Sequence, residues 1–335
     1  MKGRIPLIII LIVTVACLLF ALWGIEMDKV RGALGSLRWS LIPAVLALLV
    51  GQFLLRVWRF QLLLGAERPT FRRQVVVSAI GFMAINVMPL RMGELVRPWL
   101  LTRDNLWIGH SLGAVVVERV LDLVALLGLL FIVAFALALP SNAIVVEGID
   151  ILAASRNAIG TLVLVAVVGG GVLALGGPRF GAWISGVRWI GPRVLRFAQV
   201  FRGAATNLVL QPALGVTVLL LSALIWIAAI AQVYVLLWAF PEVPNTATVA
   251  TTVATVTFAG VITIPTPGFF GPFEVFCKAT LLIWAVDPGV AATFAVVWHL
   301  HIFAFNLLPG LAFMLHEGLS FTSLVHDSRT SPTSS

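Results

Sequence analysis

The chain has 335 residues, of which 60% are hydrophobic and only 11% are charged, and its mean hydropathy is +1.07. A soluble domain carries about a quarter charged residues, so this composition excludes a soluble globular protein and indicates an integral membrane protein. The net charge of +8 comes mostly from arginines in short segments between apolar runs, which predicts contact with anionic lipid and argues against nucleic acid as a partner.

Apolar runs of about twenty residues predict spanning helices and not a barrel. The first covers residues 6–23, and the basic residues before it place its start in the cytoplasm. Residues 26–38 form a short external segment of mixed charge, and the second helix covers residues 41–64. It ends in a basic cluster that we place on the cytoplasmic side, comprising Arg56, Arg59, Arg68, Arg72 and Arg73.

Residues 75–101 are the first irregular region. Their apolar part is too short to cross a membrane comfortably, and it is interrupted at residues 86–89. We therefore expect a re-entrant hairpin that enters and leaves on the cytoplasmic side. A spanning helix over residues 110–139, an external loop over 141–157 and a returning helix over 158–175 follow.

Residues 176–207 hold five arginines and no acid. The part over residues 188–202 is basic and amphipathic, so we expect it to lie on anionic headgroups. Residues 212–240 then cross outward, residues 246–284 form a second irregular region, and residues 289–315 cross back.

The predicted fold is therefore an all-α membrane bundle of six full spans and two re-entrant hairpins built from broken helices. It forms one transmembrane domain over residues 1–316, followed by a polar, disordered cytoplasmic tail over residues 317–335. Both termini lie in the cytoplasm, and the two hairpins open to opposite sides of the membrane. Each hairpin has a proline break, a glycine and then a glutamate, which is the pattern of an inverted repeat.

The second irregular region contains "ITIPTPGFFGPFE" at residues 262–274. Backbone freed by prolines cannot face lipid, so this segment is buried in protein or lines a wet cavity. Pro272 suits the first turn of a new helix, which places Glu274 in the same turn. The carboxylate either serves a substrate or proton path or belongs to a buried helix break and pairs with an arginine. The residues that shape this break are Pro265, Pro267, Gly268, Gly271 and Pro272.

The first irregular region contains "NVMPLRMGELVRP". On a helix, Arg91, Glu94 and Arg97 share a side, so Glu94 can neutralise one arginine and leave the other for an anion. The planar guanidinium fits two phosphate oxygens. The alternative is an interfacial arginine pair that extends toward the headgroups. Three neighbours at the break complete this candidate site: Asn86, Pro89 and Gly93.

The predicted helix over residues 110–139 contains "ERVLDL". Glu118 and Asp122 lie one turn apart on one face with Arg119 beside them, and such charges are costly in a membrane unless they are paired inward. They could neutralise Arg91 or Arg97. We expect a structural salt bridge for Asp122, and the residues leave the roles of Glu118 and Arg119 open.

His299 and His301 lie in the last predicted span. Two residues apart on a helix, they do not share a face, which argues against a metal site formed by both. We expect each to bond to a group of a neighbouring helix. The chain contains no nucleophile triad, phosphate-binding loop, dinucleotide fingerprint or metal-ligand spacing, so we expect neither an enzyme nor a bound cofactor or metal.

These motifs occur in a definite order: "RVWRFQLLL", then N-x-x-P-x-R-x-G-E, then S…ER-x-x-D, then I-P-x-P-G-x-x-G-x-x-E. Over residues 7–315 the chain thereby resembles the flippase-like membrane domain of lysylphosphatidylglycerol synthases. The resemblance implies a multi-pass inner-membrane protein that binds or moves lipids. We find no soluble aminoacyl transferase domain in the chain, so the resemblance does not imply lysyl transfer. Members often carry an arginine near the start of the last helix, where this chain has His299 and His301.

The leading hypothesis is a translocator of an anionic or phosphate-bearing lipid or lipid-linked precursor. Arg91 and Arg97 hold the headgroup, while Glu94, Glu118 and Glu274 balance charge or carry protons. The alternatives are an accessory subunit of an envelope-lipid enzyme or glycosyltransferase, a membrane enzyme acting on a lipid phosphate, and a scaffold. The choice of lipid, the direction, the driving ion and the oligomeric state stay open.

Overall fold

The computed structural model describes residues 26–88, 93–137, 145–146, 149–150, 160–161, 210–263 and 266–319. Several predictions from the sequence fall outside these residues. They concern the first spanning helix, most of the external loop, nearly all of the returning helix, the basic segment, the tail beyond residue 319, and the individual residues Pro89, Arg91 and Pro265.

The N-terminal half contains α2 (Met27–Ser36), α3 (Ile42–Leu63), α4 (Phe71–Val87), α5 (Val96–Thr102) and α6 (Ile108–Phe135). Short 3-10 turns precede and follow α3, at Trp39–Leu41 and Gly65–Glu67. A single antiparallel pair, β1 (Val145–Val146) with β2 (Ile149–Asp150), comes next. The C-terminal half contains α10 (Pro212–Ala239), α11 (Ala247–Thr263), the 3-10 turn η4 (Pro267–Phe269), α12 (Pro272–Leu282) and α13 (Pro288–His316).

Local signals explain where these helices begin. Thr70 caps α4 by accepting the amide hydrogen of Arg73, and Asp287 caps α13 by accepting those of Gly289 and Val290. Proline occupies the first turn of α3, α10, α12 and α13, where its missing N–H costs nothing. The helix boundaries lie within a few residues of those expected from the apolar runs.

Three helical stretches among the described residues are long and apolar enough to cross a membrane: Trp39–Leu63, Pro212–Ala239 and Pro288–His316. The molecule is therefore a helical membrane protein. Helix α6 has a comparable 28 residues, but its middle carries Glu118, Arg119 and Asp122. Those charges need partners inside the bundle.

Both predicted interruptions are present. Helix α4 ends at Val87, Met88 adopts an extended conformation, and α5 begins only at Val96. Helix α11 ends at Thr263, and α12 begins at Pro272 after η4. Asn86, which we expected at the break, lies in the last turn of α4.

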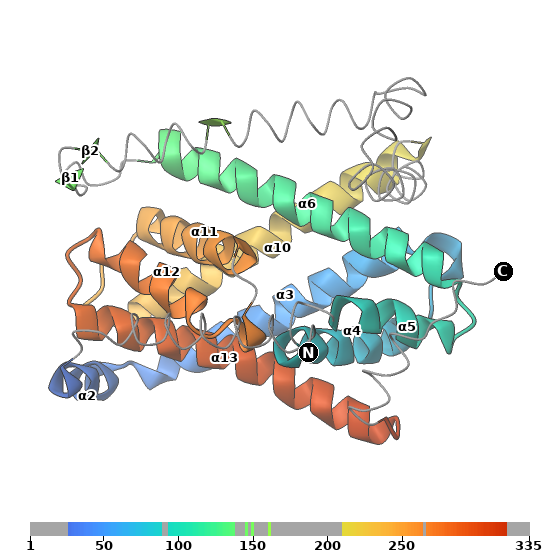
Figure 1. Ribbon diagram of the computed structural model, residues 1–335, viewed down its shortest axis with the longest axis horizontal. Coiled ribbons are helices and arrows are strands. Elements are labelled where there is room, and N and C mark those ends of the chain that lie inside the picture. The colour runs from blue at the N-terminus through green and yellow to red at the C-terminus, as the bar shows by residue number, and fades with distance from the viewer. Residues whose placement is uncertain are drawn as a thin grey trace, which may run out of the picture.

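Helix α13 holds the two halves together. It runs along the lower side of the view in Figure 1 and contacts α2 and α12 toward one end and α4 toward the other. Helix α6 crosses the upper side and contacts α11 as well as α5. A Cβ at Gly310 of α13 would overlap Met83 of α4, so glycine permits this close approach of the two helices.

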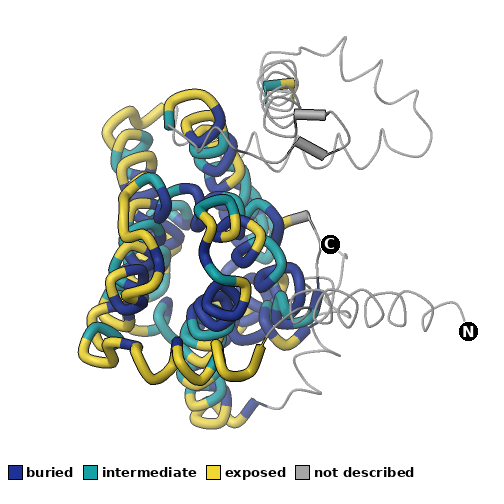
Figure 2. Tube along the Cα trace, turned by 90° about the vertical axis from the view of Figure 1, so that its left-hand side faces the viewer, coloured by how far each residue is buried: buried dark blue, intermediate teal, exposed yellow. Residues whose placement is uncertain are grey.

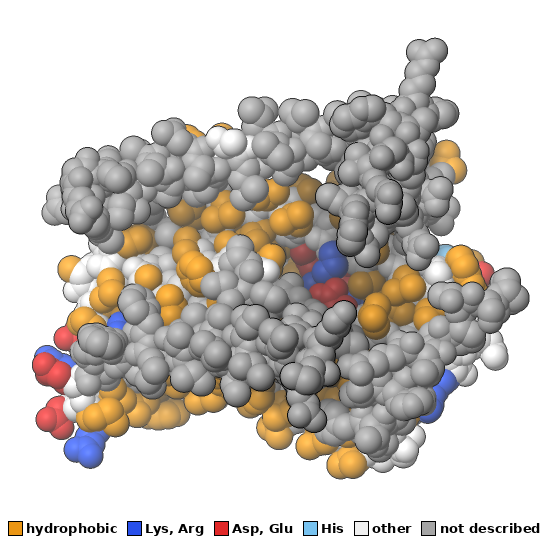
Figure 3. Space-filling model, in the orientation of Figure 1, with side chains coloured by type: hydrophobic (Ala, Val, Ile, Leu, Met, Phe, Trp, Pro, Cys, Tyr) orange, Lys and Arg blue, Asp and Glu red, His pale blue; other side chains and the backbone are white. Residues whose placement is uncertain are grey.

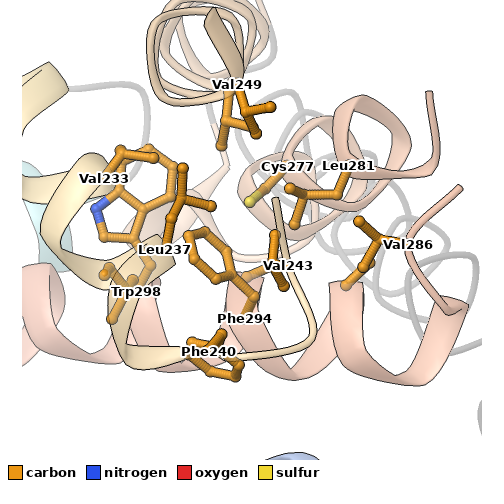
Figure 4. Close-up of a cluster of buried hydrophobic side chains, with 14 of the residues drawn as sticks. Val233, Leu237, Phe240, Val243, Val249, Cys277, Leu281, Val286, Phe294 and Trp298 are labelled. Carbon is orange, nitrogen blue, oxygen red and sulfur yellow. The ribbon is translucent and has the colours of Figure 1, made fainter. Parts of the chain in front are cut away.

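Buried residues gather where the helices meet, and exposed residues face outward (Figure 2). One hydrophobic cluster joins α10, α11, α12 and α13, with Phe240, Phe294, Trp298 and Cys277 at its centre (Figure 4). A second joins α3, α4 and α5, with Phe60, Ile80 and Leu100 among its members. Each interrupted region therefore lies beside its own apolar core.

Candidate functional site

A network of buried charges joins three helices of the N-terminal half. We call it the ion cluster, and it comprises Arg59 of α3, Arg97 of α5, Glu118, Arg119 and Asp122 of α6, and Glu94, which precedes α5.

Glu118 lies at the centre of the ion cluster and is completely buried. One of its carboxylate oxygens accepts a hydrogen bond from Arg97 at 2.7 Å, and the other accepts one from Arg59 at 3.2 Å. Both arginine side chains are also fully buried. A carboxylate shared by two guanidinium groups compensates part of the cost of removing all three charges from water.

Arg59 is held by two further groups. Its guanidinium lies 2.8 Å from the carboxylate of Asp122 and donates a 3.0 Å hydrogen bond to the hydroxyl of Ser222 on α10. The sequence groups Arg59 with the other arginines of a basic cluster. In the structure Arg59 instead faces the acids of α6 inside the bundle.

Arg119 and Glu94 form the more accessible part of the ion cluster. The Arg119 side chain is 33% exposed and lies 3.4 to 3.7 Å from carboxylate oxygens of Asp122, Glu118 and Glu94. Glu94 thus faces an arginine of α6, whereas the sequence suggested a partner within its own segment. Figure 3 shows basic and acidic side chains together in a hollow of one face, with hydrophobic side chains around them.

The ion cluster has three arginines and three carboxylates, and one further arginine beside it gives the region an excess of positive charge. Arg56, one turn before Arg59, lies with its guanidinium 5.9 Å from the Phe82 ring centre, and that of Arg97 lies 5.2 Å from the same centre. Within the described part of the chain, no carboxylate lies within ion-pair distance of Arg56. Four arginines therefore face three carboxylates.

Several buried donors of this region have no hydrogen-bond partner among the residues that the structure describes. They are Nε and Nη1 of Arg97, Nε of Arg59 and Nδ2 of Asn86. Unsatisfied buried donors are rare in native proteins, and each calls for an explanation. A bound group with acceptor oxygens would satisfy them.

Two glycines set the position of Arg97. A Cβ at Gly81 of α4 would overlap the Arg97 side chain, which packs along α4 at this point. A Cβ at Gly93 would overlap the backbone of Ala84 and Ile85, so glycine allows the chain to return close to α4 before α5 begins. Asn86 and Gly93 therefore both lie beside the interruption.

The second candidate site pairs Glu274 of α12 with His299 of α13. Nδ1 of His299 lies 2.6 Å from one Glu274 oxygen, and Nε2 lies 2.8 Å from the carbonyl oxygen of Gly268. The other Glu274 oxygen accepts the amide hydrogen of Gly271 at 2.7 Å, which completes a cap on α12. The predicted place of Glu274 in the first turn after Pro272 is confirmed, but its partner is a histidine and not an arginine.

Backbone geometry and aromatic rings hold this pair in place. Gly268 and Gly271 have φ values of 62° and 93°, a region that favours glycine. The Phe273 ring stacks on His299 at 4.4 Å with an angle of 13° between the planes, and Phe270 contacts the imidazole from 4.6 Å. The pair is therefore surrounded by aromatic rings, and its remaining polar atoms bond to the backbone of the Gly268–Gly271 turn.

The remaining candidate residues have structural contacts. His301 faces away from His299 and bonds to the carbonyl oxygen of Val297 in its own helix, so the expected partner on a neighbouring helix is wrong for His301. Pro267 opens η4, next to Gly268. Across the described ranges, no group of three or more His, Cys, Asp or Glu side chains is arranged to hold a metal ion.

The sequence predicts Arg97, Glu118, Arg119 and Asp122 as candidate residues, and the structure brings them together. The prediction missed Arg59 as a member, although Arg59 lies within the apolar run of its helix and not beyond its end. That position was the available signal, because a charge inside a span needs an inward partner.

Comparison with known proteins gives one family. The family model described as "Lysylphosphatidylglycerol synthase TM region" matches residues 7–310 of the chain. No match is found among curated proteins. The matched range contains both interrupted regions and both candidate sites.

Proposed function

Since this chain belongs to the family of the lysylphosphatidylglycerol synthase transmembrane region, we propose that it translocates an anionic or phosphate-bearing lipid across a cytoplasmic membrane. The observation that carries this proposal is the charge of the ion cluster together with Arg56 beside it. Four arginines face three carboxylates inside an apolar bundle, and donors of Arg97 and Asn86 lack partners. A phosphate supplies both the missing negative charge and the missing acceptors.

The proposed path follows the two interrupted regions. In our proposal each is a re-entrant hairpin, and the two open to opposite sides of a bundle with six full spans and cytoplasmic termini. The structural support for a common path is that η4 of the second region contacts α4, the helix that leads into the first region. A headgroup moving past this contact would find polar groups on both sides, while its acyl chains stay in lipid.

Residue roles follow from accessibility and pairing. Arg97, together with Arg91, holds the headgroup, and Arg56 adds the unpaired charge. Arg119 and Glu94, the more accessible members, exchange partners as the anion enters. Glu118 and Asp122 keep the arginines in position. In this proposal the protein is a transporter and not an enzyme, and its partners are anionic membrane lipids.

The test is reconstitution in liposomes with a trace of fluorescent lipid whose accessibility to a quencher is followed from the outer leaflet. We expect wild-type protein to move a phosphate-bearing anionic lipid faster than empty liposomes do. Arg56→Gln should lower this rate because it removes the excess charge without breaking an ion pair of the cluster. The matched control is Arg68→Gln, an exposed arginine just beyond the same helix.

Equal rates for wild type and Arg56→Gln, in correctly inserted protein that moves lipid, would remove the assigned role of the ion cluster. A wild-type protein that binds the anionic lipid but moves none would replace translocation with an accessory role in envelope-lipid synthesis.

A further inference from the structure

The partners of His299 and Glu274 determine how many protons the pair holds. A carbonyl oxygen only accepts, so Nε2 of His299, which faces Gly268, carries a hydrogen. The Gly271 amide only donates, so the Glu274 oxygen that faces it is an acceptor. The remaining contact, Nδ1 to the other carboxyl oxygen at 2.6 Å, requires one hydrogen between two atoms that both have lone pairs.

The contact between Nδ1 and the carboxyl oxygen is stable only when one proton lies between the two atoms. With one proton, the pair is either imidazolium with carboxylate or imidazole with carboxylic acid, and its net charge is zero in both forms. If the proton leaves, two acceptors face each other and the pair is negative. If a second proton arrives, two donors face each other and the pair is positive. Either change breaks the contact and leaves a net charge among aromatic rings, which is costly.

Among the described residues, the surroundings offer little to compensate such a charge. His299 is 2% exposed, and Phe270, Phe273 and Phe303 surround its ring. Helix α11 and η4, which pack around the pair, contain no titratable side chain. The other titratable groups nearby on α12 and α13 are Cys277, Lys278 and His301, and His301 is turned to its own helix.

We propose that Glu274 and His299 form a one-proton site whose occupancy decides whether the Gly268–Gly271 turn stays attached to α13. In the closed state the pair shares one proton. Opening releases that proton to water and leaves a carboxylate and a neutral imidazole, each free to be hydrated. Closing takes one proton up again. At a pH above the ordinary pKa of a hydrated imidazole, about 6.5, the closed state binds one more proton than the open state, so in that range a rise in pH favours opening.

The turn connects this site to the ion cluster. Its 3-10 segment η4 contacts α4, and α4 carries Gly81, against which the Arg97 side chain packs. Opening of the turn therefore removes a support of α4. The inference that this movement accompanies lipid transfer, so that one proton is exchanged per cycle, rests on the proposed function.

The first measurement is an infrared titration of the protein in lipid, which requires no transport. As pH rises, we expect the bands of the Glu274 carboxyl group and of the His299 imidazole to change together with one common midpoint. His301→Gln, the control on the same helix, should keep both changes. Glu274→Gln and His299→Gln should each abolish the change at the other residue. Separate midpoints, or bands that do not change, overturn the shared-proton site, and wild-type protein alone suffices for that decision.

The second measurement uses the same protein in liposomes that contain a pH-sensitive dye and a fluorescent anionic lipid. We expect lipid movement to be accompanied by proton movement, and both to be lost in His299→Gln but kept in His301→Gln. Lipid movement that is insensitive to a pH gradient and to His299→Gln overturns the coupling and leaves the translocator intact. If wild type moves no lipid but shows the common titration, the translocator fails and the proton site stands.

Discussion

The two interrupted regions of this protein place their acidic residues in different settings. In the first, Glu94 lies at the margin, and the central acid is Glu118, which comes from α6 and holds two buried arginines. In the second, Glu274 stays local, caps its own helix and bonds to one histidine. The same order of proline, glycine and glutamate thus leads to a many-membered network in one half and to an isolated pair in the other.

This difference separates two ways of keeping polar groups inside a membrane protein. The ion cluster stays charged and depends on complete pairing. Removing one partner therefore leaves another charge buried with nothing to compensate its lost hydration. The histidine pair is neutral as a unit and depends on one proton. The first arrangement suits binding of a charged group, and the second suits a change of state.

The largest expected effect comes from Glu118→Gln. This change removes the carboxylate that both Arg59 and Arg97 contact, and we expect a loss of about 3–5 kcal/mol in unfolding free energy, as for other broken buried ion pairs. Unfolding in detergent micelles measures it. Glu26→Gln, an exposed acid before α2, serves as the control. A loss below about 1 kcal/mol would show that Glu118 is not the centre of the cluster.

Particular residues show how far the sequence could predict this structure. The boundaries of α3, α10 and α13 follow from local signals, since an apolar run and a capping or proline residue are both read within a few positions. The interruption before α12 was equally predictable from the sequence, because prolines and glycines break a helix at their own positions. The pairing of Arg59 with Asp122 was not, because it depends on how helices far apart in the chain cross one another.

The partner of Glu274 illustrates the same limit more sharply. Its place as the third residue of α12 was predictable, because Pro272 opens that helix. Its contact with His299 depends on the rotation of α13, which carries another histidine two positions on. Spacing alone excluded a shared metal site, but it did not tell which of the two rings faces α12.

A second prediction concerns the close approach within the first region. Gly93→Ala would place a Cβ against backbone atoms of Ala84 and Ile85. Backbone atoms cannot move aside without shifting the helix, so we expect the free energy of unfolding to fall by about 1–3 kcal/mol. Gly128→Ala on α6 is the matched control, because nothing lies within 4 Å of its Cβ position. Thermal unfolding of both variants checks this, and equal stability would contradict the tight packing at Gly93.

A third prediction compares the histidine pair with the ion cluster. A double-mutant cycle of Glu274→Gln and His299→Gln should give a coupling of about 1–2 kcal/mol, because the two residues contact each other directly. The cycle of Glu274→Gln with His301→Gln should give none. Additive effects at the first pair would mean that the 2.6 Å contact contributes nothing to stability.

The smallest effect is expected where charges are partly exposed. Arg73 of α4 pairs with Asp104 at 2.9 Å and with Glu317 after α13 at 2.7 Å. We expect Glu317→Gln to cost less than about 1 kcal/mol and the cost to fall as salt is added. Unfolding at low and high salt measures this. A cost that is large and independent of salt would place this group with the buried cluster instead.

The three charges in the middle of α6 also bear on how the protein is made. A charged residue at the centre of a helix opposes membrane insertion by about 2.5–3.5 kcal/mol, so α6 is a poor candidate for entering a bilayer by itself. Its two main partners, Arg59 and Arg97, lie earlier in the chain and leave the ribosome first. Insertion of α6 is thereby tied to helices already present, and biogenesis, like transport, depends on the charges meeting in pairs.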